Sequence, residues 1–136
     1  MSKTTKTISR ILLLIYIGLL AYLCFGHFDH VPQIIRKFWG IEQDKVIHFC
    51  MFFPFPILAY FSVGKIFRTY GRALTFVLIV FLIGCLIGAA TELGQGLTTY
   101  RSADPKDFSA DALALAASSV LSFIICIIQR LHHSDA

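Results

Sequence analysis

The chain alternates between long apolar stretches and short polar segments, and most of its charged residues stand at the ends of the apolar stretches. A helix that crosses a bilayer needs roughly 20 mostly apolar residues. Four such stretches lie at approximately 8–25, 46–63, 73–97 and 108–131. The pattern therefore predicts an all-α integral membrane bundle of four transmembrane helices.

The segment between the first two spans, His27–Gln43, has an apolar repeat of its own. Its apolar residues recur at i, i+3, i+4, i+7 and i+8, which is one face of a helix: Val31, Ile34, Ile35, Phe38 and Trp39. Pro32 suits the first turn of such a helix. We expect a short outer interfacial helix, which is either a plain amphipathic linker or a lid over the bundle.

The composition agrees with a membrane protein. Of the 136 residues, 57% are hydrophobic and 15% are charged, whereas about a quarter of the residues in soluble domains are charged. The four spans take up most of the chain, so we expect a single transmembrane domain over residues 1–136. The first span begins like a signal peptide, but no small-residue cleavage site follows it, so we interpret it as a span.

Lys and Arg residues near span ends predict the orientation, because they are retained on the cytoplasmic side. Cytoplasmic termini place most of the 12 Lys and Arg residues inside: Lys3, Lys6, Arg10, Lys65, Arg68, Arg72 and Arg130. All acidic residues except Asp135 then lie outside. We therefore expect a multi-pass protein with cytoplasmic N- and C-termini. The net charge of +4 reflects this topology, so we expect no nucleic-acid partner.

The second span contains the sequence Phe53-Pro54-Phe55-Pro56. Each proline removes a backbone N–H, so carbonyls near Cys50 and Phe52 lose their helical partners. A freed carbonyl inside a membrane needs another donor. We expect a kink in the helix here, which either simply fits the bundle or has a direct role in contacting a ligand.

The third and fourth spans carry matching stripes of small and polar residues. In the third, Gly84, Gly88, Glu92 and Gln95 share a stripe. The fourth has the corresponding set of Asp107, Asp111, Ala114, Ser118 and Ser122. Small residues let helix backbones approach closely in a membrane. We expect these two faces to pack together and to bring Glu92 toward Asp111.

The polar residues at the span ends form one candidate polar site, because charges inside a membrane are rare without partners. Its members are Asp44, Lys45, His48, Glu92, Gln95, Arg101, Asp107 and Asp111. Arg101 is the expected partner of Glu92, and Lys45 is the second choice. Helix capping is an alternative explanation for Asp104, Asp107 and Asp44.

His48 lies one turn beyond Asp44 on the same helix face, so Asp44 is expected to orient its imidazole. His48, Glu92 and Asp111 could also bind a metal, but a single histidine without paired spacing is a weak zinc signature. The four cysteines fall one per span and form no CxxC pair. We expect no metal and no cofactor.

Several of these residues occur in a recognisable order: Asp44-Lys45-Val46-Ile47-His48-Phe49, Glu92-Leu93-Gly94-Gln95, Arg101, and Asp107-Phe108-Ser109-Ala110-Asp111. In this respect the chain resembles the VanZ-like membrane proteins, whose pattern runs DKxxHF, ExxQ, R and DxxAN. The resemblance covers residues 44–118. Asp111 departs from the family's Asn, and Ala114 and Ser118 stand where Gly is common, so a role that needs an amide at position 111 does not carry over.

The resemblance implies a cell-envelope protein of the bacterial inner membrane, associated with resistance to the glycopeptide antibiotic teicoplanin. It leaves two classes of function open. One is binding or modification of a membrane lipid, a lipid-linked envelope component or a lipoglycopeptide. The other is a membrane-embedded hydrolase or transferase with His48 as general acid or base. Proton-coupled transport is a third and weaker class, since four spans would have to assemble into an oligomer.

Overall fold

The computed structural model describes residues 3–26, 37–38, 41–64, 67, 69–98 and 103–134. The helices are α1 (Lys3–Phe25), α2 (Gln43–Phe52), α3 (Pro54–Val63), α4 (Tyr70–Gly96) and α5 (Pro105–Ser134). Helices α2 and α3 together form one span. Among the described residues, 4 helical segments are long and apolar enough to cross a membrane. The predicted bundle of four transmembrane helices is confirmed.

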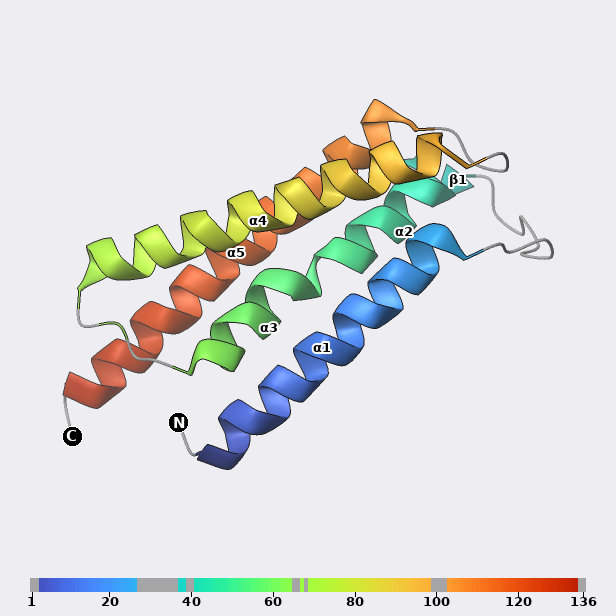
Figure 1. Ribbon diagram of the computed structural model, residues 1–136. Coiled ribbons are helices and arrows are strands. Elements are labelled where there is room, and N and C mark those ends of the chain that lie inside the picture. Colours follow the sequence, from blue (N-terminus) through green and yellow to red (C-terminus); the bar gives the residue numbers. More distant parts are fainter. Residues whose placement is uncertain are drawn as a thin grey trace.

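The helices lie side by side, and the two chain ends are found at the same end of the bundle (Figure 1). The opposite end carries the start of α2, the end of α4 and the start of α5, and we refer to it as the polar end. Helix α4 packs mainly on α5, α1 on α3, and α2 on α5. Helix α5 therefore contacts both of the other helices that contribute to the polar end, α2 and α4.

The outer surface of the bundle is apolar. Large hydrophobic side chains such as Leu14, Leu86 and Leu93 are mostly exposed. Water would disfavour so many exposed aliphatic groups over the full length of the helices, whereas lipid would solvate them. The exposed surface therefore fits a bundle that stands in a bilayer.

The outer segment between α1 and α2 differs from the prediction where it is described. Strand β1 (Lys37–Phe38) pairs antiparallel with strand β2 (Ile41–Glu42), with Lys37 opposite Glu42. The two strands are separated by two residues in the sequence, which is the commonest spacing of a β-hairpin. The predicted helix over His27–Gln43 is therefore wrong at these residues, because local strand pairing replaces its last turn. Residues 27–36 and 39–40 lie outside the described part.

The second span is interrupted at Phe53, between α2 and α3. Pro54 has no N–H to donate to the carbonyl of Cys50, so the hydrogen-bond ladder cannot continue. The hydroxyl of Tyr16 on α1 donates to the neighbouring carbonyl of Met51. The interruption lies at the predicted kink, and a side chain from the first span supplies a donor beside it.

The glycines of α4 pack against α5 as predicted, and their nearest neighbours there are Leu115 and Asp111 rather than small residues. A Cβ atom on Gly84 would lie 2.5 Å from Leu115 Cδ2, and one on Gly88 would lie 3.3 Å from Asp111 Oδ2. Ala114 and Ser118 on α5 are fully buried. The two helices approach so closely that Gly84 leaves no room for a larger side chain unless Leu115 moves. This approach brings the ends of α4 and α5 together.

Candidate functional site

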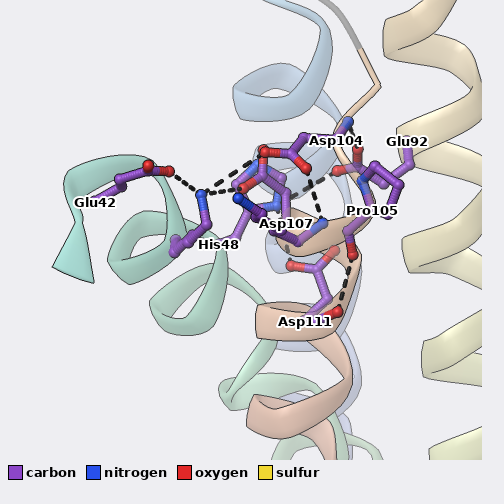
Figure 2. Close-up of polar contacts among 10 residues, drawn as sticks. Glu42, His48, Glu92, Asp104, Pro105, Asp107 and Asp111 are labelled. Atoms are coloured by element: carbon purple, nitrogen blue, oxygen red, sulfur yellow. Dashed lines mark hydrogen bonds and ion pairs between the residues drawn. The ribbon is translucent and has the colours of Figure 1, made fainter.

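Three helices bring a histidine and two carboxylates together at the polar end (Figure 2). His48 Nδ1 on α2 shares a hydrogen bond with Asp111 Oδ1 on α5, at 3.0 Å. Glu92 Oε1 on α4 lies 3.7 Å from the same nitrogen. The exposed fractions are 2% for His48, 6% for Glu92 and 0% for Asp111. We call these three residues the His48 cluster.

The cluster forms because its residues occupy equivalent depths in their helices. His48 and Asp111 follow the starts of α2 and α5 by one to two turns, and Glu92 precedes the end of α4 by about one turn. These three ends meet at the polar end. The predicted convergence of Glu92 and Asp111 is confirmed, and His48 lies with them.

The partners of Glu92 differ from those that the sequence suggested. Its Oε2 accepts a hydrogen bond from the backbone N–H of Asp104, at 3.1 Å. The prediction that Lys45 pairs with Glu92 is wrong, because Lys45 lies among other acids. Arg101, the first choice, lies outside the described residues.

Lys45 organises the exposed border of the site. Its Nζ pairs with Glu42 and lies 3.7 Å from Asp104 Oδ2 and 3.6 Å from Asp107 Oδ1. The hydrogen bond from Lys45 lowers the pKa of the exposed Glu42 carboxyl. We call Glu42, Asp44, Lys45 and Asp104 the rim. Asp107 is buried beneath it, between the rim and the His48 cluster.

Two other predicted site residues have different roles. The side-chain amide of Gln95 donates to the carbonyl of Cys24, at 3.0 Å, so it ties α4 to α1 rather than joining the cluster. Asp44 is exposed in the first turn of α2 and does not cap it, since Glu42 occupies the N-cap position. His48 shares its hydrogen bond with Asp111 rather than with Asp44, although an Asp44 carboxylate oxygen lies within 4.8 Å of a His48 ring nitrogen.

Asp104 makes two hydrogen bonds at the polar end, one through its side chain and one through its backbone N–H. Its Oδ1 accepts from the backbone N–H of Lys106, at 2.9 Å, so the predicted capping role of Asp104 at the start of α5 is confirmed. Its own N–H holds Glu92. A backbone donor has no signature in side-chain spacing, so sequence reasoning could not find this contact.

An apolar cavity of about 350 Å³ lies between α1 and α2, beside the break at Phe53. Its lining combines residues of both spans: Tyr16, Leu19, Leu20, Leu23, Val46, Ile47, Cys50, Met51 and Pro54. Helix α2 therefore carries His48 on one face and part of an apolar cavity on another.

The donor atoms at this end are suitable for holding protons or a cation. The ligand atoms of His48, Glu92 and Asp111 all lie within 4.8 Å of one another, and so do those of Asp44, His48 and Asp107. Imidazole with two carboxylates is a donor set that can exchange a proton or bind a divalent metal. His48 belongs to both sets.

The fold and the site define a multi-pass helical membrane protein with a buried histidine and carboxylate cluster at one end. No protein-family model, curated protein or solved structure matches the chain. The VanZ-like resemblance therefore stays a prediction that rests on the sequence pattern alone.

Two lysines at the polar end, Lys45 and Lys106, should differ in how much they stabilise the protein. The substitution Lys45→Met removes the cation nearest to the buried Asp107, and we expect it to lower the free energy of unfolding because that carboxylate then has no lysine beside it. The substitution Lys106→Met removes an exposed lysine and should change that energy by less than about 0.5 kcal/mol. Unfolding of both variants in one detergent would measure the difference, and equal effects would contradict the pairing.

Proposed function

We propose that the chain is a VanZ-like envelope protein of the bacterial inner membrane that binds the polar part of an amphiphilic envelope molecule. Candidate ligands are a membrane lipid, a lipid-linked wall precursor or a lipoglycopeptide such as teicoplanin. The observation that carries this proposal is the His48 cluster, in which three spans hold buried hydrogen-bonding groups directly below a solvent-exposed rim.

The apolar cavity supports an amphiphilic ligand over a purely polar one. An acyl chain could enter between α1 and α2, next to the break at Phe53, while its polar part reaches the rim. Ligand sites typically combine an apolar wall with a few well-placed polar groups. The cavity and the rim together meet that description.

The charge of the polar end favours hydroxyl or amine groups on the ligand. Among the described side chains at this end, the acids outnumber the lysines: Glu42, Asp44, Glu92, Asp104, Asp107 and Asp111 against Lys45 and Lys106. Carboxylates accept hydrogen bonds and repel bare anions. Sugar hydroxyls and amino groups would therefore bind more readily than a free phosphate.

A second candidate is a membrane-embedded hydrolase or transferase with His48 as general acid or base. The 3.0 Å hydrogen bond between His48 and Asp111 favours it, because a carboxylate can orient a histidine for proton transfer. The two candidates differ in whether a ligand is altered, so the chemical state of the ligand distinguishes them.

The proposal requires the rim to face the outside of the cell. In a background with Cys50→Ala and Cys85→Ala, we expect Ala103→Cys to react with an impermeant maleimide on intact cells, because Ala103 is exposed and lies two residues before the start of α5. Thr4→Cys, which is exposed at the opposite end, should react only after the cells are opened. The reverse pattern of labelling would place the site in the cytoplasm and refute the orientation.

Antibiotic protection tests the binding function directly. Expression in a teicoplanin-susceptible bacterium should raise the inhibitory concentration of teicoplanin but not that of its deacylated form. Glu92→Gln and His48→Ala should abolish protection because each removes a hydrogen-bonding group of the His48 cluster. Ile47→Trp should weaken it by filling the cavity. Ser109→Ala, which removes an exposed hydroxyl at the same end but outside the rim and the His48 cluster, is the control and should still protect.

Membrane levels of all variants must be equal in this experiment, and protection by the cluster variants at equal levels would contradict the proposal. Mass spectrometry of lipids and wall fragments from the same cells separates the two candidates. Binding leaves these molecules unchanged. An enzyme produces a modified species that disappears with Glu92→Gln.

A further inference from the structure

Two buried carboxylate oxygens in the His48 cluster have no hydrogen-bond partner among the described residues. They are Glu92 Oε1 and Asp111 Oδ2. The second oxygen of each side chain is engaged, Glu92 Oε2 by the Asp104 N–H and Asp111 Oδ1 by His48. Both side chains are more than nine-tenths buried. A carboxylate oxygen in such surroundings is costly unless a donor or a cation meets it.

The spacing of the donor atoms fits a single metal ion. His48 Nδ1 lies 3.0 Å from Asp111 Oδ1 and 3.7 Å from Glu92 Oε1, and the ligand atoms of the three residues lie within 4.8 Å of one another. Ligands held at about 2.0 to 2.2 Å around a tetrahedral ion are roughly 3.4 Å apart. The three atoms could therefore reach one ion with small side-chain rotations, after the proton shared by His48 Nδ1 and Asp111 Oδ1 has left to solvent.

The charges of the cluster also match a divalent cation. Two carboxylates carry two negative charges, and a neutral imidazole carries none, so a divalent ion brings the total to zero. Uncompensated charge is expensive within a membrane span. A protonated His48 would offset one of the two carboxylates.

We infer that His48, Glu92 and Asp111 together bind one divalent transition-metal ion, with Zn²⁺ and Mn²⁺ as the best matches. Imidazole favours Zn²⁺ over Mg²⁺ or Ca²⁺, and carboxylates suit both Zn²⁺ and Mn²⁺. A metal here differs from the expectation drawn from the sequence, in which the one histidine had no paired ligand. Its partners come from α4 and α5, which only the packing of the helices brings into reach.

Two neighbouring features bear on how the ligands are held. The Asp104 N–H fixes the Oε2 atom of Glu92 and leaves Oε1 facing His48. Gly88 lies so close to Asp111 that an added Cβ would be 3.3 Å from Oδ2. A hydrogen bond such as the one from Asp104 fixes ligand geometry in metal sites, whereas Gly88 only leaves space for the Asp111 carboxylate. Three protein ligands also leave a coordination position for an oxygen atom of a bound headgroup.

Metal binding can be tested on purified protein in detergent, stripped with a chelator and then given Zn²⁺ or Mn²⁺ alone. We expect one bound ion per chain and a higher unfolding temperature, since a ligand that binds only the folded state stabilises it. Glu92→Gln and Asp111→Asn should each weaken binding roughly tenfold or more. Glu42→Gln, an exposed acid of the rim, should bind as the wild type does.

Asp44, His48 and Asp107 form a second group that could hold a metal ion, so the experiment must distinguish the two groups. If Asp107→Asn abolishes binding while Glu92→Gln does not, the assignment is overturned. Pulsed electron paramagnetic resonance of the Mn²⁺-loaded wild type needs no variant to fold, and it should show coupling to one imidazole nitrogen. Absence of stoichiometric metal, or bound Mn²⁺ without that coupling, would also overturn it.

The metal site uses the same side chains as the proposed ligand site but does not depend on a ligand. The metal measurements contain neither lipid nor antibiotic. If the wild-type protein binds no metal, the metal site is refuted and the protection experiment still tests the proposed function. If the wild-type protein binds metal but gives no protection, only the proposed function is refuted.

Discussion

The hydrogen bond between His48 on α2 and Asp111 on α5 is the contact on which the polar end depends. Asp111 is fully buried, and a buried carboxylate in a membrane span is costly unless a donor or cation meets it. His48 meets it at 3.0 Å, and Glu92 reaches the same nitrogen from α4. Helices α2, α4 and α5 must therefore have their polar turns at one depth, because misalignment would leave a carboxylate without a partner.

The packing of the helices brings His48 and Asp111 into contact and places them near an apolar cavity. Gly84 and Gly88 let α4 approach α5, and the proline break lets α2 and α3 contact α1 through Tyr16. One side of α2 then faces charge and another faces an apolar cavity, an arrangement that suits an amphiphile. A divalent cation in the His48 cluster would add positive charge to an acidic site, so it would widen the range of oxygen-bearing headgroups that the site accepts.

The spans and the approach of α4 to α5 were predictable from the sequence, and the partners of individual polar side chains mostly were not. The spans, the break at Pro54 and the close faces of α4 and α5 follow from hydropathy, proline geometry and small-residue spacing. The partners of Lys45 and Gln95 depend on which helices are neighbours, which periodicity does not specify. The Asp104 N–H that holds Glu92 is a backbone group and is invisible to residue patterns. The hairpin at Lys37–Glu42 was missed because a helical repeat and a short strand pair can share the same apolar residues.

The most direct measurement of the central contact is a double-mutant cycle with His48→Ala, Asp111→Ala and the combined variant, unfolded in one detergent. A cycle isolates the interaction from the separate cost of each truncation. We predict that the combined variant loses less free energy of unfolding than the two single variants lose together. The difference should be about 1 kcal/mol or more. Additive losses, within about 0.3 kcal/mol, would show that the two side chains do not interact and would contradict the account.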